Sequence, residues 1–311
     1  MNLNQNNSSP GTYLALSGAV FFWGLSFVAT KIALESFSTF TLIFVRLALA
    51  ACLLLLLMKH FGLPSFSRKE HFKVFLTALF EPGLYFIFET VGLQHTSAPK
   101  AALIIATIPL AVTAFAAMFL RERTSMAGLA GIGISLVGIA VLVVGDPQFS
   151  WDLRGSLMGD LLMFGAVISA AVYIVCARDL GQRHSALQIT GMQIIYGAIF
   201  YAPAFLWELP DVNWSAFSGR SLIALIYLTL FATVAAFLCY NYALTQISAS
   251  RASLFINCIP LVTAVAAWIL LGEKLTLMQV SGGVLVLVAV CLTNLSAFRS
   301  QSRRKLGESV A

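Results

Sequence analysis

A repeat at half the chain length is the feature that most constrains the fold. The segment 97–125, SAPKAALIIATIPLAVTAFAAMFLRERTS, recurs 151 positions later in 248–276 as SASRASLFINCIPLVTAVAAWILLGEKLT, with 11 identities over 29 ungapped positions. Each copy is a long apolar stretch with a proline at mid-length, Pro109 or Pro260, and a charged turn at its end. Self-similarity at a fixed period is the mark of a chain built from like units. We therefore expect two halves of one design.

The composition predicts a membrane protein. The 311 residues are 59% hydrophobic and only 10% charged, whereas soluble domains are about 25% charged. The net charge of +6 comes from basic residues in short clusters between apolar runs. That arrangement orients a membrane protein and does not predict a nucleic-acid partner. The five cysteines lie in apolar runs without metal-ligand spacing, so we expect neither a disulfide nor a metal site.

The apolar runs predict an all-α protein with ten membrane-spanning helices. A spanning helix needs about 20 mostly apolar residues. The runs that meet this length within a few residues are 12–33, 38–58, 72–93, 98–120, 126–145, 156–177, 186–207, 221–244, 249–271 and 277–297. The first eleven residues carry no Lys or Arg, unlike a cleaved signal peptide, so the first run is expected to remain as a helix.

The Lys and Arg residues predict the orientation. With the N-terminus inside, 13 of them fall on the cytoplasmic side and 5 on the outer side, and Arg46 lies within a span. The outer ones are Lys31, Lys100, Arg154, Arg220 and Lys274. The positive-inside rule then places both termini in the cytoplasm.

The number of spans per half predicts inversion of the second half. Five spans is an odd number, so the second half must enter the membrane upside down relative to the first. Inverted repeats are typical of secondary transporters, whose substrate site lies near the midplane between the repeats.

Short motifs in both halves resemble the EamA-type repeat of the drug/metabolite transporter superfamily. They are Phe22-Trp23-Gly24, Gly92-Leu93, Thr96-Ser97-Ala98, Tyr242-Ala243-Leu244, Ile247-Ser248-Ala249 and Leu271-Gly272-Glu273-Lys274-Leu275-Thr276. The resemblance covers about 13–295. It implies two inverted five-helix repeats, 12–145 and 156–297, before a basic cytoplasmic tail, 298–311. It also implies export of amino acids or other small metabolites across the cytoplasmic (inner) membrane. The first half departs from the pattern at 120–123, where arginine replaces the usual glycine of the turn.

Ionisable residues within the predicted spans are the candidate transport residues, because such groups are costly in a membrane. Glu81, Tyr85 and Glu89 are spaced i, i+4, i+8, which places them on one face of a helix. Pro82 follows Glu81 directly and can interrupt the helix. We expect Glu81 or Glu89 to bind an amine of the solute, to exchange a proton, or both. The alternative is a structural ion pair with Arg46 or, for Glu89, with Lys100.

Further candidates are an arginine, two aromatic residues and an asparagine. Arg46 is expected to be structural or to hold a solute carboxylate. Trp23 and Tyr173 suit a pocket for an amphipathic metabolite, or else serve packing. Asn257, which precedes Pro260, is expected to line the cavity or else to lie beside a structural kink, and both Pro109 and Pro260 are expected to kink their helices. Asp160 is expected to be solvated at the outer end of its helix, and Lys31 and Glu35 are expected to form a local ion pair.

The sequence favours a transporter over an enzyme. None of the four histidines lies inside a predicted span, and neither HExxH, GxSxG nor a nucleotide-binding P-loop is present. No cofactor is expected, and the predicted partners are a small-molecule solute and membrane lipid. Energy would come from an ion gradient, from exchange or from the solute's own gradient. The expected activity is export by alternating access, with proton coupling as one option. The alternative is uptake or facilitated diffusion of a drug, nucleoside or sugar. Glycines in 126–145 and 277–297 allow close helix contact within a monomer or a homodimer.

Overall fold

The protein is helical throughout the part that the computed structural model describes, which is residues 10–119, 155–247 and 249–289 with isolated positions between 130 and 147. This part contains seven helices long and apolar enough to cross a membrane. Four are α1 (Pro10–Ala33), α2 (Thr39–Phe61), α8 (Ser156–Leu180) and α9 (Ala186–Glu208, extended by a short 3-10 turn to Asp211). These agree with the expected runs.

The remaining spans are interrupted helices. The span 68–95 consists of α3 (Arg68–Ala78), η1 (Leu79–Leu84) and α4 (Tyr85–His95), and the span 219–246 of α10 (Gly219–Tyr227), η4 (Leu228–Ala235) and α11 (Ala236–Gln246). The two copies of the repeat are broken as well: α5 (Ala98–Ile105) and α6 (Ile108–Phe119) form one, and α12 (Ala249–Ser253), η5 (Leu254–Cys258) and α13 (Ile259–Leu271) form the other. A further apolar helix runs over Leu277–Ala289.

Several predictions fall on residues outside the described ranges. The run 126–145 is described only at isolated positions, and the turn 120–123 and the tail 298–311 lie outside altogether. The count of ten spans, the inversion and the repeat boundaries therefore stay predictions.

Local sequence signals explain the helix ends. Ser67 and Glu70 form a capping box at the start of α3, and Ser185 and Gln188 form another at the start of α9. Each pair satisfies amide groups that the first helical turn leaves free. Gly272 ends α13 with φ of 69°, a left-handed conformation that glycine adopts without a steric penalty.

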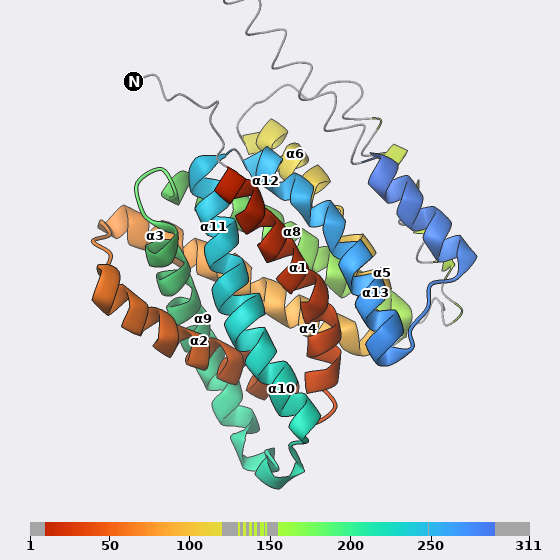
Figure 1. Ribbon diagram of the computed structural model, residues 1–311, viewed down its shortest axis with the longest axis horizontal. Coiled ribbons are helices and arrows are strands. Elements are labelled where there is room, and N and C mark those ends of the chain that lie inside the picture. The colour runs from red at the N-terminus through yellow and green to blue at the C-terminus, as the bar shows by residue number, and fades with distance from the viewer. Residues whose placement is uncertain are drawn as a thin grey trace, which may run out of the picture.

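Helices from the two halves of the chain pack against each other. In Figure 1, α2 lies beside α9, and α1 lies between α11 and α13. The helix α4 packs on α8. One large apolar core therefore unites both halves, and the centre of the molecule lies between them.

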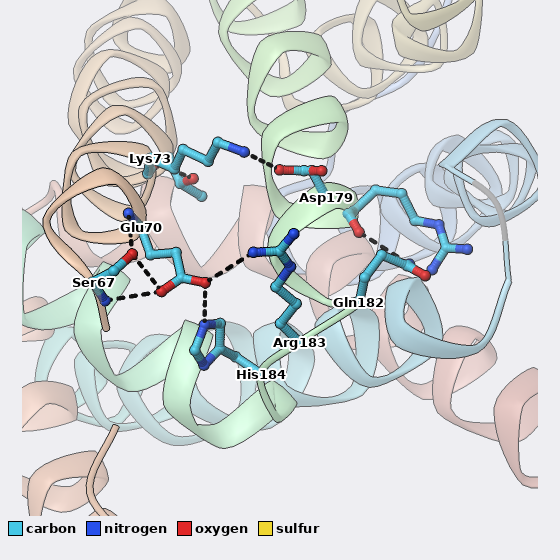
Figure 2. Close-up of polar contacts among 9 residues, drawn as sticks. Ser67, Glu70, Lys73, Asp179, Gln182, Arg183 and His184 are labelled. Carbon is cyan, nitrogen blue, oxygen red and sulfur yellow. Dashed lines mark hydrogen bonds and ion pairs between the residues drawn. The ribbon is translucent and has the colours of Figure 1, made fainter. Parts of the chain in front are cut away.

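A polar cluster links the two halves at the end where α3 begins. Figure 2 shows Glu70 facing His184 and Arg183, at 3.2 Å and 3.7 Å, while Lys73 pairs with Asp179 of α8. The helix α3 is thus tied to the turn between α8 and α9. The positive-inside prediction would place this cluster at the cytoplasmic face.

Three ion pairs link the halves at the opposite end, and they correct three expectations. Lys31 pairs with Glu273 at 2.6 Å and not with Glu35, whose partner is Arg220 at 3.6 Å. The expectation of a solvated Asp160 is also wrong. Its carboxylate pairs with the Lys100 ammonium at 2.8 Å, and the two side chains are 2% and 0% exposed. Lys100 therefore pairs with Asp160 and not with Glu89. Burial makes this pairing necessary, because a lone charge in the apolar core is strongly disfavoured.

Candidate functional site

A cavity of about 40 Å³ lies among α1, α2, α4, α8, α11 and α13. This volume is well below the roughly 300–1,000 Å³ of sites that enclose a drug-sized ligand, so a solute would require the surrounding helices to move apart. Its lining contains most of the polar residues predicted from the sequence. These are Trp23, Arg46, Glu81, Tyr85, Glu89 and Tyr173. Apolar residues such as Phe27, Phe86, Phe237 and Ile259 complete the wall.

The helix that carries the acidic residues is interrupted at Glu81. The backbone there is extended, with φ of −143° and ψ of 111°, and Glu81-Pro82 is a cis peptide bond. Glu81, Tyr85 and Glu89 therefore do not share one continuous helix face, which corrects the geometric expectation. All three nevertheless line the cavity. Since Pro82 has no amide hydrogen, the interruption lies where the regular helical hydrogen bonding cannot continue.

The two carboxylates face the cavity without a protein partner in the described part of the chain. Glu81 is 4% exposed and Glu89 is 3% exposed. Among the described residues, neither carboxylate has a hydrogen bond or an ion pair within 4.0 Å; the Gln193 side chain bonds the backbone carbonyl of Glu81, not its carboxylate. Buried charges are normally paired. These two acids are therefore available to a solute or to protons.

Arg46 lies near both acids but is held by other groups. Its Nε donates to Thr233 Oγ1 at 2.5 Å, and its guanidinium lies over the Phe86 ring at 4.2 Å from the centroid. Glu89 and Glu81 both act on it electrostatically. Arg46 thus balances part of the cavity's negative charge without a hydrogen bond or an ion pair to either carboxylate.

Aromatic side chains fix the shape of the wall. The Trp23 indole donates to the carbonyl of Ala232 at 3.1 Å and packs on Phe237 and Tyr240, with ring centroids 5.3 Å and 5.0 Å away. The Tyr173 hydroxyl donates to Asn241 at 2.8 Å. Trp and Tyr held in this way give a rigid apolar surface with polar edges, which suits an amphipathic solute.

Asn257 lies outside the cavity lining, and Pro109 and Pro260 lie near the start of helix segments. Asn257 is half-buried in η5 and is not part of the cavity lining, although its neighbour Ile256 is. Pro109 and Pro260 each occupy the second position of a new helix, α6 and α13, after a short break. Proline is well tolerated in a first turn because no intrahelical amide bond is lost there. The interruptions therefore lie in the turn directly before each proline, where a proline ring disturbs a helix.

The sequence reasoning missed the polar face of α9. Gln193 and Tyr201, both buried, hydrogen-bond the backbone carbonyls of Glu81 and Gly83. Their spacing with Gly197, four residues apart each time, is visible in the sequence. Nothing in the sequence indicated which segment this face would contact.

Comparison with known proteins identifies the family. The EamA-like transporter family model matches residues 10–144 and again 157–295. An uncharacterized transporter of Archaeoglobus fulgidus is 30% identical over 282 residues, covering 89% of this chain and 96% of the relative. The uncharacterized transporter YetK of Bacillus subtilis is 24% identical and covers 91% of this chain and 86% of its own.

A plant protein and a solved structure are also similar to the chain. The chloroplastic WAT1-related protein At3g02690 of Arabidopsis thaliana is 28% identical over 301 residues, covering 91% of this chain and 70% of its own. A crystal structure of a protein with 17% identity superposes with a TM-score of 0.67 over 94% of this chain and 99% of the other, which supports the fold. With the family model matched over both halves, the chain belongs to the EamA-like transporter family, and it is a membrane transporter and not an enzyme.

Proposed function

We propose that the protein exports amino acids or related amine-bearing metabolites across the cytoplasmic membrane by alternating access. The observation that carries the proposal is the pair of acidic side chains, Glu81 and Glu89, that face a central cavity without a partner among the described residues. A carboxylate in such a site binds an ammonium group or a proton, and one group can serve both in turn. Arg46 leaves the cavity with a net formal charge of −1 when all three groups are ionised, which favours a solute with a positive centre.

The architecture that we propose for this activity is ten spans in two inverted halves, with both termini in the cytoplasm. The double match of the family model supports two like units. The packing of α2 on α9 and of α4 on α8 supports a solute pathway between them. Rocking of one repeat against the other would open the cavity to each side in turn.

Efflux from loaded cells tests the proposal. Cells are loaded with a panel of labelled amino acids and amino-acid derivatives, and efflux is compared between wild type and Glu81→Gln, with and without a protonophore. Glu35→Gln is the matched control, since Glu35 is exposed and lies outside the cavity. We expect selective efflux that Glu81→Gln and the protonophore abolish at unchanged membrane abundance.

The other outcomes have defined meanings. Efflux that persists with the protonophore and with Glu81→Gln would replace proton-coupled export by facilitated diffusion and would remove Glu81 from the mechanism. An absence of efflux for the whole panel, with uptake of a drug, nucleoside or sugar instead, would overturn both the direction and the solute class.

A further inference from the structure

One face of α9 holds the interrupted backbone that carries Glu81. Gln193 Nε2 donates to the carbonyl oxygen of Glu81 at 2.6 Å, and the Tyr201 hydroxyl donates to the carbonyl oxygen of Gly83. Between them Gly197 faces Pro82 so closely that a Cβ at position 197 would lie 2.4 Å from Pro82 Cγ. Three positions of α9, spaced i, i+4 and i+8, thus contact three consecutive residues of η1.

These contacts compensate for what the interruption removes. Inside a membrane a carbonyl that leaves the helical pattern has no water to bond, so another protein group must bond it. Gln193 is 0% exposed and Tyr201 is 3% exposed, so both donors lie in the interior away from solvent. Gly197 has no side chain, which allows α9 to approach Pro82 directly. The face of α9 therefore fits this interruption and would not fit a regular helix.

We propose that Gln193, Gly197 and Tyr201 form a cradle that positions the Glu81 carboxylate in the cavity. The cradle rests on the proposed function, since it assigns positioning residues to the acid that we place in transport. None of the three belongs to the cavity lining, so they do not contact a solute there themselves.

The cradle is also bonded to a second wall of the cavity. Asn241 of α11 donates to Thr190 at 2.8 Å and to Gln193 Oε1 at 3.4 Å, and its own Oδ1 accepts from the Tyr173 hydroxyl at 2.8 Å. Tyr173 lines the cavity on α8. The acid on one wall and the phenol on the other therefore have a common support, and a shift of α9 would move both.

Chemical labelling of the carboxyls tests the cradle without knowledge of the solute. Dicyclohexylcarbodiimide, an apolar reagent that adds to protonated carboxyl groups, is applied to membranes holding the full chain, and mass spectrometry gives the ratio of Glu81 to Glu89 labelling. Glu89 serves as an internal standard because it lies on α4, beyond the cradle. We expect Gln193→Met to change this ratio about fivefold, as loss of a buried hydrogen bond would.

Matched variants separate positioning from general damage. Gln246→Met and Tyr242→Phe alter exposed residues of the same types and should leave the ratio unchanged. If Gln193→Met does not accumulate, Tyr201→Phe removes a single hydroxyl and gives the same test at Gly83. A ratio that stays at the wild-type value in both Gln193→Met and Tyr201→Phe would overturn the cradle.

A double-mutant cycle relates the cradle to transport. In membranes holding the full chain, Gln193→Met should weaken binding of the labelled amino acid that wild type exports about tenfold, and it should have no further effect on the residual binding in Glu81→Gln. Independent losses that multiply would contradict a role through Glu81. The two proposals fail separately: retained transport in Glu81→Gln would refute the transport role of Glu81, whereas the labelling ratio alone decides the cradle.

Discussion

At the scale of single residues, the cavity acids differ from the other acids at partly or fully buried positions in the described part. Asp160 is paired with Lys100, Glu273 with Lys31, and Glu208 accepts hydrogen bonds from the start of α2. Each of these carboxylates has a structural partner. The carboxylates of Glu81 and Glu89 have no such partner among the described residues, and both residues line the cavity. This contrast is the reason that we assign them to transport.

Replacement of Arg46 by lysine should not be conservative. The guanidinium donates to Thr233 and lies over Phe86 at once, and a lysine ammonium lacks the planar group that does both. We expect Arg46→Lys to lower the transport rate about tenfold, the effect of roughly 1.4 kcal/mol. Efflux at equal membrane abundance is the measurement. Thr233→Val should reproduce part of the loss, and full activity in Arg46→Lys would show that only the charge matters.

Loss of one partner of the buried ion pair should be worse than loss of both. Lys100→Met leaves the Asp160 carboxylate buried without its cation, at a cost of about 3–5 kcal/mol. The double variant Lys100→Met/Asp160→Leu removes both charges and should recover most of that stability. Denaturation of the purified protein in detergent gives the comparison. A double variant as unstable as Lys100→Met would show that the unpaired Asp160 carboxylate is not the cause of the lost stability.

At the scale of elements, the sequence predicted where helices lie better than where they are interrupted. The apolar runs identified α1, α2, α8 and α9 because length and hydropathy suffice for an uninterrupted span. The interruption at Ala106–Thr107 lies two to three residues before Pro109, since the proline falls in the first turn of the helix that follows. Residues 228–235, which form η4, include no proline that could have indicated the interruption. This segment packs against α1 and α2.

The link between α1, α5 and α13 should depend on the identity of residue 273 as well as on its charge. The Glu273 carboxylate pairs with Lys31 and also accepts from the Ala98 amide at 2.8 Å, at the start of α5. Exchanging the charges, Lys31→Glu with Glu273→Lys, restores the pair but places a cation at a helix N-terminus and removes the acceptor.

The exchanged variant should therefore remain about 1 kcal/mol less stable than wild type, the usual cost of a lost helix cap. Thermal unfolding in detergent measures this difference, with Glu35→Gln as a control for an exposed acid. Full recovery of stability on exchange would mean that the ion pair alone holds these helices together.

At the scale of the whole molecule, the sequence predicted the membrane class, the family and six of the residues that line the cavity, but not the contacts between the halves. The resemblance rested on local motifs, and the cavity residues were recognised because ionisable groups in spans are rare. Contacts such as Gln193 with Glu81 join positions far apart in the chain. They depend on how the helices pack, which periodicity within one helix does not specify.

The predicted orientation can be tested with cysteines placed at opposite ends. In a variant without the five native cysteines, Ser65→Cys lies before α3 and Asn213→Cys lies between α9 and α10. A membrane-impermeant maleimide applied to intact cells should label position 213 and leave position 65 unlabelled until the cells are opened. The reverse pattern would place the termini outside and invert the assignment of the two polar clusters.

Counterflow in proteoliposomes tests whether the cavity acids, Glu81 and Glu89, bind the transported solute. Vesicles loaded with one unlabelled amino acid from the efflux panel are diluted into a trace of the same labelled compound, and transient accumulation is recorded for wild type, Glu81→Gln, Glu89→Gln and the control Glu35→Gln. We expect accumulation in wild type and in the Glu35→Gln control, and its loss in at least Glu81→Gln. Equal accumulation in all four proteins would contradict it.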